Sequence, residues 1–111
     1  MPRLTLAMPI ACLTAGLALA SPLALAQAVD GDALAAKNNC FACHAKDHKL
    51  VGPAYKDVAA KYAGDKGAAD KLFNKVKKGG AGVWGTVPMP PNSQVSDADI
   101  KSLVAWVLKM K

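Results

Sequence analysis

Residues 40–44 read Cys40-Phe41-Ala42-Cys43-His44, and this stretch decides the fold. Two cysteines separated by two residues and followed directly by a histidine form the pattern by which haem is attached covalently to a polypeptide. Each thiol can add to one vinyl group on the same edge of the porphyrin, and the next residue then places an imidazole beneath the iron. The motif therefore predicts one haem c, held through Cys40 and Cys43, with His44 as a ligand of the iron.

Two other uses of these cysteines stay open at this point. A zinc site would combine the two thiols with His44 and His48, but these adjacent ligands lack the hairpin and helix that separate ligand pairs in small zinc modules. A redox disulfide of the thioredoxin kind would need a βαβ setting, and no strand pattern flanks the motif. Haem attachment is the interpretation that uses both cysteines and the adjacent histidine.

The start of the chain has the features of a secretory signal peptide. In order, these are Arg3, an apolar run over 4–20, the helix breaker Pro22 and the small-residue cleavage site Ala24-Leu25-Ala26. We therefore expect a signal peptide over 1–26 and a single haem domain over 27–111. The overlapping site Ala26-Gln27-Ala28 would extend the signal peptide to 1–28.

Export would also explain the cysteine usage. Cys12 lies inside the leader, so the mature chain keeps only the two motif cysteines. In an oxidising compartment two such thiols would ordinarily pair as a disulfide, and haem attachment gives them a different fate. We expect a periplasmic protein with no stable membrane anchor. The alternative is an uncleaved anchor, because the segment 4–26 is long enough to span a bilayer.

About 85 residues remain after cleavage, enough for one domain. The apolar residues recur with helical spacing, and no alternating run argues for a strand. We expect an all-α fold of about four helices around the haem, with Trp106 packing at the flank of the last helix. The first expected helix covers about 30–38, and the second runs from an opening Pro53 to near Gly64. The third runs from Ala69 to a stop at Gly79-Gly80. The fourth begins at a cap formed by Ser96 and Asp99 and continues through Leu108.

The segment 82–92 reads GVWGTVPMPPN and can form neither a helix nor a central strand because of its prolines. The three prolines around Met89 reduce the entropy lost in holding its thioether in one place. Two other methionines belong to the leader, and Met110 lies at the chain end. Met89 is therefore the candidate for the sixth iron ligand.

Two alternatives to this ligand stay open. Met89 can instead be ordinary gap-filling apolar material, which is the usual role of a methionine. The competing ligand is His48, but its tether from His44 is only about 14 Å when fully extended, too short to pass comfortably around a porphyrin to its opposite face. We expect His48 to be a solvated loop histidine.

With these motifs the chain resembles the small periplasmic class I cytochromes c of the cytochrome c-551 type, over essentially the whole mature chain. The resemblance rests on the motif at 40–44, on VGPAYKDVA over 51–59, on GVWG over 82–85 and on PMPPN over 88–92. It implies a class I cytochrome c fold. It also implies three supporting roles: the Pro53 carbonyl accepts from the histidine ring, Trp84 donates to a haem propionate, and Asn92 supports the methionine loop. Lys75 stands where the type has a basic residue near a propionate, although a lysine there can equally be solvated.

Two axial ligands would leave no iron position for a substrate, which predicts an electron carrier and not an enzyme. The resemblance suggests a membrane quinol-oxidising complex as electron donor and nitrite reductase as acceptor, in respiration on nitrogen oxides (denitrification). A terminal oxidase or a peroxidase is an equally open acceptor. The alternative function is that of a haem enzyme or gas sensor with an open or labile sixth position.

The charge balance bears on partners and not on the fold. The mature chain has thirteen lysines and eight aspartates, a net charge of +5 before the haem propionates are counted. We expect a monomer that is steered to acidic partners by lysines near the two ligand segments, namely Lys46, Lys49, Lys75, Lys77 and Lys78. A merely solvated lysine surface is the alternative. Nucleic acid is a poor partner, because the mature chain has no arginine and few aromatic residues.

Overall fold

The computed structural model describes residues 30–111, together with residues 11, 12 and 16. Apart from those three positions, the predicted signal peptide (1–26, or 1–28) lies outside the described residues. Among the residues that are described, no helix has the length and apolar character needed to cross a membrane.

Residues 30–111 form four α-helices and one short 3₁₀ turn, and within this range the only β-type pairing is a single bridge between Gly80 and Met89. In chain order the elements are α1 (Gly31–Lys37), η1 (Cys40–Ala42), α2 (Tyr55–Lys61), α3 (Ala68–Lys78) and α4 (Asp97–Leu108). The prediction of an all-α fold with about four helices is confirmed, and η1 is the element that the sequence did not indicate.

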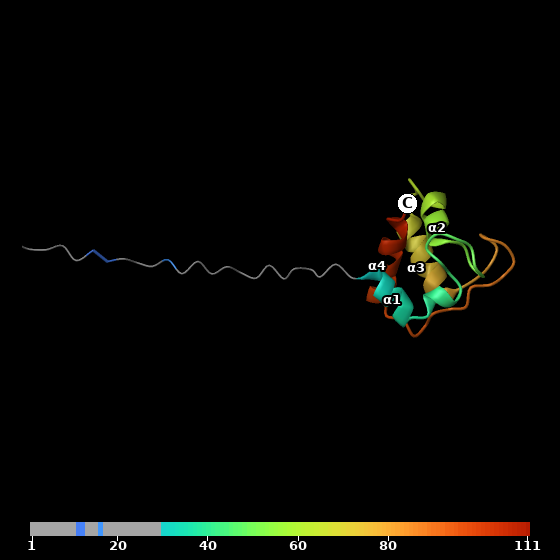
Figure 1. Cartoon of the computed structure of the whole chain (residues 1–111), viewed down its shortest axis with the longest axis horizontal. Coiled ribbons are helices and arrows are strands. Elements are labelled where there is room, and N and C mark those ends of the chain that lie inside the picture. The colour runs from blue at the N-terminus through green and yellow to red at the C-terminus, as the bar shows by residue number, and fades with distance from the viewer. Residues whose placement is uncertain (1–10, 13–15, 17–29) are drawn as a thin grey trace, which may run out of the picture.

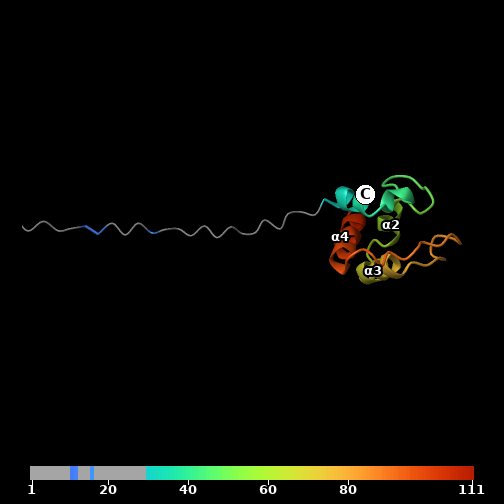
Figure 2. The same ribbon diagram turned by 90° about the horizontal axis from the view of Figure 1, so that it is seen from below.

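Helix α4 is the element on which the other helices pack. It contacts α1, α2 and α3, as the two views in Figure 1 and Figure 2 show. Its helical start is stabilised as predicted, because the Ser96 hydroxyl accepts from the backbone N–H of Asp99 at 3.1 Å. The apolar stripe of α4 is buried, and its members are Ile100, Leu103, Val104 and Val107. This stripe forms one wall of the protein interior.

Helix α2 begins later than the sequence predicts. Pro53 does not open it, because Ala54 is extended (φ −60°, ψ 142°) and the helix starts at Tyr55. The N–H groups of the first two helical residues donate to the carbonyls of Ala45 and Lys46 at 2.9 and 3.0 Å. Backbone carbonyls just after the motif therefore accept from the first N–H groups of α2. The Pro53 carbonyl is not used in these hydrogen bonds and can accept from a side chain.

The crossing of α1 and α4 depends on a glycine. A Cβ atom at Gly31 would lie 2.1 Å from Cγ of Trp106, so only a residue without a side chain allows the two helices to approach this closely. Trp106 also makes edge contacts with Tyr55 (centroids 5.5 Å apart) and Phe41 (6.4 Å). Trp106 is partly buried against the core, and it joins α1, η1 and α2 to α4.

Replacing Gly31 with alanine is expected to destabilise the protein by roughly 1–3 kcal/mol, because the new methyl group must push the indole out of its packed position. The measurement is the free energy of unfolding in urea, made on the haem-containing protein. Gly67→Ala is the matched control, since a Cβ at Gly67 would come no closer than 3.4 Å to its nearest neighbour, Asp65. Equal losses in the two variants would contradict the packing role of Gly31.

Candidate functional site

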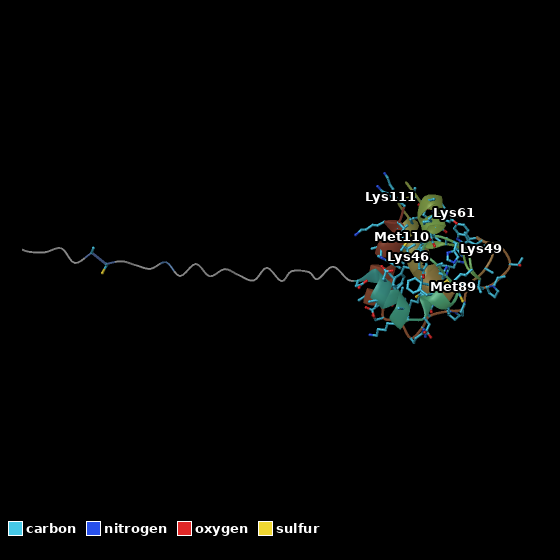
Figure 3. The ribbon with its side chains drawn as sticks, viewed as in Figure 1. Lys46, Lys49, Lys61, Met89, Met110 and Lys111 are labelled. Carbon is cyan, nitrogen blue, oxygen red and sulfur yellow. The ribbon has the colours of Figure 1, made fainter. Side chains whose placement is uncertain are left out.

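A cavity of about 330 Å³ lies between helix α4 and the two long loops that follow the motif and α3. This volume is within the range of roughly 300–1,000 Å³ found for ligand and cofactor sites. Its apolar walls include Val58 of α2, Leu72 of α3 and Leu103 of α4. Figure 2 shows the two loops extending from the same side of the helices, and Figure 3 shows Met89 and Lys49 on that side.

The structure brings all the predicted site residues to this one cavity. They come from η1, from both loops and from α3, and the set that lines the cavity contains Cys40, Cys43, His44, Pro53, Lys75, Trp84, Met89 and Asn92. His48, the competing ligand, does not line it: its ring is exposed and contacts the Asp47 carboxylate at 2.8 Å.

The motif is shaped by a turn around the Cys40 carbonyl. Asn39 adopts a left-handed conformation (φ 60°) just before η1. The Cys40 oxygen then accepts from the backbone N–H groups of Cys43 and His44 at 3.2 and 3.0 Å. Both thiols are free. Burial raises the pKa of the Cys40 thiol, and a hydrogen bond with the Tyr55 hydroxyl partly opposes that rise.

The His44 imidazole is held by a backbone carbonyl. Its Nδ1 lies 2.8 Å from the Pro53 oxygen. A carbonyl can only accept, so Nδ1 carries the proton and donates it, which leaves the lone pair of Nε2 free to bind a metal. A donor interaction of this kind fixes both the tautomer and the position of a ligating histidine.

The methionine segment is attached to the end of α3. Gly80 and Met89 exchange backbone hydrogen bonds, at 3.0 Å from the Gly80 N–H and 2.8 Å from the Met89 N–H. Asn92 binds the Val76 carbonyl twice, through its backbone N–H at 3.1 Å and through its side-chain amide at 3.0 Å. The same amide also reaches the Pro90 carbonyl at 3.3 Å. Met89 is therefore held on both sides at the cavity wall.

Gly79 does more than stop α3, which is the only role that the sequence predicts for it. It has φ +70°, and a Cβ there would lie 2.4 Å from the Met89 carbonyl oxygen. The sequence did contain a signal for this close approach. A single glycine suffices to end a helix, so the second glycine of the pair Gly79-Gly80 indicates a further constraint at this point. Gly52 approaches the His44 ring just as closely, since a Cβ at Gly52 would lie 2.5 Å from Cε1, and this contact had no comparable signal.

The cavity mouth carries Trp84, which is 43% exposed. The Lys61 ammonium lies 5.3 Å from the centroid of its indole, in cation–π geometry. Lys49 and Lys75 line the cavity as well, together with the acidic Asp57.

These residues fit a covalently attached haem. The cavity is apolar, two free thiols and an imidazole lie along one segment of its wall, and a thioether belongs to another segment. In the described part of the chain, no three His, Cys, Asp or Glu side chains gather in a metal-binding cluster, so the zinc alternative is not found there. An all-α fold around such a cavity defines the class of c-type haem proteins.

Comparison with known proteins gives the family. The model of the family described as cytochrome c matches residues 28–111. Cytochrome c-552 of Nitrosomonas europaea is 56% identical over 93 residues, which cover 83% of this chain and 90% of that protein. Cytochrome c-551 of Pseudomonas aeruginosa is 52% identical over 96 residues, covering 84% of this chain and 91% of that protein. The crystal structure of N. europaea cytochrome c552 superimposes with a TM-score of 0.70 at 57% identity, over 72% of this chain and 99% of the other.

The chain belongs to the cytochrome c family. It is accordingly a small electron-transfer protein and not an enzyme, and it carries haem c attached through Cys40 and Cys43. The family match and the similar crystal structure confirm both the predicted class I cytochrome c fold and the predicted cofactor.

Replacing Gly79 with alanine is expected to destabilise the protein by about 1–3 kcal/mol more than Gly64→Ala does, because the new methyl group would clash with the Met89 carbonyl and break its pairing with Gly80. Unfolding in urea measures the loss, and amide shifts over 88–92 report the displaced loop. Gly64→Ala is the control: Gly64 also has positive φ (+77°), but a Cβ there would meet no atom within 4 Å. If the two variants lose the same stability and the loop shifts do not change, the contact with Met89 is unimportant.

Proposed function

We propose that the protein is a periplasmic, monomeric electron carrier whose haem iron is bound by His44 and Met89. The observation that carries the proposal is that these two side chains line one cavity, and that each is held there by backbone hydrogen bonds. When bound, the haem supplies a one-electron iron couple, and a histidine and methionine pair gives it a higher potential than two histidines would.

The residues around the two ligands keep them in place. The Pro53 carbonyl orients the His44 ring and makes its free nitrogen a better donor. The hydrogen bonds of Asn92 and Gly80 hold the Met89 segment against α3. With both ligands fixed, no coordination position remains for a substrate, which suits a carrier that changes its charge without making or breaking bonds.

Two further residues act at the propionate edge in this proposal. Trp84 donates its indole N–H to a propionate, and Lys75 places a positive charge nearby, as the resemblance to cytochromes c-551 implies. Their presence at the wall of the same cavity supports these roles. The Lys61 ammonium beside the indole adds a second positive charge at this edge.

The cellular setting is also part of the proposal. Export is supported by the signal-peptide pattern over 1–26 or 1–28, and the region matched by the family model begins at residue 28, next to the two cleavage sites. We expect the donor to be a membrane quinol-oxidising complex and the acceptor to be nitrite reductase, in denitrification.

Met89→Ala tests the ligand set. We expect the sixth iron position to open, so that the weak methionine-to-ferric-iron absorption band disappears, the reduction potential falls and the ferrous protein binds carbon monoxide rapidly. Loss of a thioether ligand removes the soft donor that favours the ferrous state. Visible spectra, redox titration and carbon monoxide mixing measure the three effects.

Met110→Ala is the matched control, because Met110 is a partly buried methionine just after the end of α4, outside the cavity lining. It should keep the wild-type spectrum and potential. A Met89→Ala protein with the wild-type spectrum would show that Met89 only packs. A wild-type protein that already binds carbon monoxide readily would favour the enzyme or sensor alternative.

The structure narrows the set of lysines expected to steer a partner. Lys46 and Lys77 form ion pairs with aspartates, at 2.5 and 2.8 Å, so their charges are partly offset. Lys49 and Lys75 line the cavity itself. Steering to the haem edge should therefore depend on the cavity lysines more than on the paired ones.

Reversing the charge at Lys49 (Lys49→Glu) is expected to slow the bimolecular reaction with nitrite reductase by about threefold or more at low salt, with the potential nearly unchanged. The difference from wild type should shrink as the Debye length falls to about 10 Å near 0.1 M salt. Stopped-flow mixing at several ionic strengths measures both. Lys101→Glu makes the same charge change on the exposed side of α4. An equal effect of this control would assign steering to the net charge of the whole chain and not to the cavity edge, whereas a salt-independent wild-type rate would assign docking to apolar contacts.

A further inference from the structure

The ring of Tyr55 lies parallel to the imidazole of His44. The two centroids are 4.9 Å apart, and the planes differ by 19°. This is an offset-stacked pair, a favoured geometry for two flat rings. Neither the motif nor the hydrogen bond to Pro53 requires an aromatic ring at this position.

Tyr55 is itself packed on several sides. It is 8% exposed, and it is the first residue of α2, where its backbone N–H donates to Ala45 at 2.9 Å. The edge contact with Trp106 (5.5 Å, 71°) and the tilted contact with Phe41 (6.3 Å, 57°) enclose its ring. The face that it presents to His44 is therefore held in place by packing on the other sides of the ring.

The hydrogen bond to Pro53 leaves one motion of the imidazole weakly restrained. It holds Nδ1 at 2.8 Å from the carbonyl oxygen, but such bonds tolerate some tens of degrees of misalignment. Rotation of the ring plane about this contact would drive a ring edge into Tyr55. Gly52 closes in as well, since a Cβ there would meet Cε1 at 2.5 Å and Nδ1 at 2.9 Å. The carbonyl thus positions one atom, whereas the stacked ring restrains the plane.

We propose that Tyr55 is a positioning residue for the proximal ligand, and that its stacked ring sets the direction of the His44 imidazole plane. The proposal rests on the proposed ligation of iron by His44. The plane of an axial imidazole determines which iron orbital it overlaps, and it therefore contributes, together with the orientation of the other axial ligand, to how unpaired spin is distributed over the haem edge in the ferric protein. A merely structural core tyrosine would not control that distribution.

The experiment compares three variants of the haem-containing protein. Tyr55→Leu removes the ring but keeps an apolar side chain, and Tyr55→Phe keeps the ring but removes the hydroxyl. Tyr62→Leu is the matched control, because it removes the other tyrosine ring from the end of the same helix, where it packs on the core without stacking on His44. The readout is the pattern of haem-methyl proton shifts in the ferric protein.

We expect Tyr55→Leu to reorder or compress the haem-methyl shifts, and Tyr55→Phe and Tyr62→Leu to keep the wild-type pattern. A wild-type pattern in a folded Tyr55→Leu protein would overturn the proposal. So would an equal change in Tyr55→Phe, which would assign the effect to the hydroxyl and its contact with Cys40, or an equal change in Tyr62→Leu, which would assign it to a general loosening of the core.

A measurement on the unmodified protein covers the case in which Tyr55→Leu does not fold. In the ferrous state, nuclear Overhauser effects are expected between the ring protons of Tyr55 and those of His44, and their absence would overturn the proposal. The ligands are checked first, through the methionine-to-ferric-iron band and the shifted His44 ring signals. If these are missing in the wild type, the proposed function itself fails. If they are present and Tyr55→Leu leaves the methyl pattern unchanged, only the role of Tyr55 fails.

Discussion

The turn around the Cys40 carbonyl is the constraint on which the rest of the structure depends. By accepting from the N–H groups of Cys43 and His44, this oxygen brings two thiols and an imidazole to one stretch of cavity wall. The imidazole is then held by a carbonyl that accepts from its Nδ1 and by an aromatic ring that stacks on its face. Pro53 and Tyr55 supply them, and their placement delays the start of α2 until after the extended Ala54. The geometry of five residues thus decides where a helix elsewhere in the chain begins.

The segment that carries Met89 is built on a different principle. It has no regular secondary structure of its own, so its rigidity is taken from prolines and from the carboxyl end of α3, through Gly80 and Asn92. Gly79 makes this possible because its missing side chain lets the Met89 carbonyl come close. An electron carrier benefits from both arrangements, since side chains that stay in place around the haem cavity reduce the rearrangement that accompanies each electron transfer.

The surface around the cavity combines two features that act at different ranges. Exposed apolar side chains, which include Val51, Val83 and Val87, surround the mouth together with Trp84. Charge at this edge acts over about a Debye length, whereas apolar contact acts only after encounter. Such a surface suits the short-lived complexes of an electron-transfer protein.

The sequence alone determined the features that follow from local chemistry. The spacing at 40–44 indicates haem attachment, the helical periodicity indicates the four helices, and the prolines around Met89 mark a shaped loop. What the tertiary structure alone decided are the close approaches between segments distant in sequence: Gly31 against Trp106, Gly79 against Met89, and Tyr55 against His44. The pairing of Lys46 and Lys77 with aspartates belongs to the same group. The physical reason is that helix periodicity and turn chemistry act between neighbours in the chain, whereas the need for a missing Cβ or a parallel ring arises only when folding brings a second surface within a few ångströms.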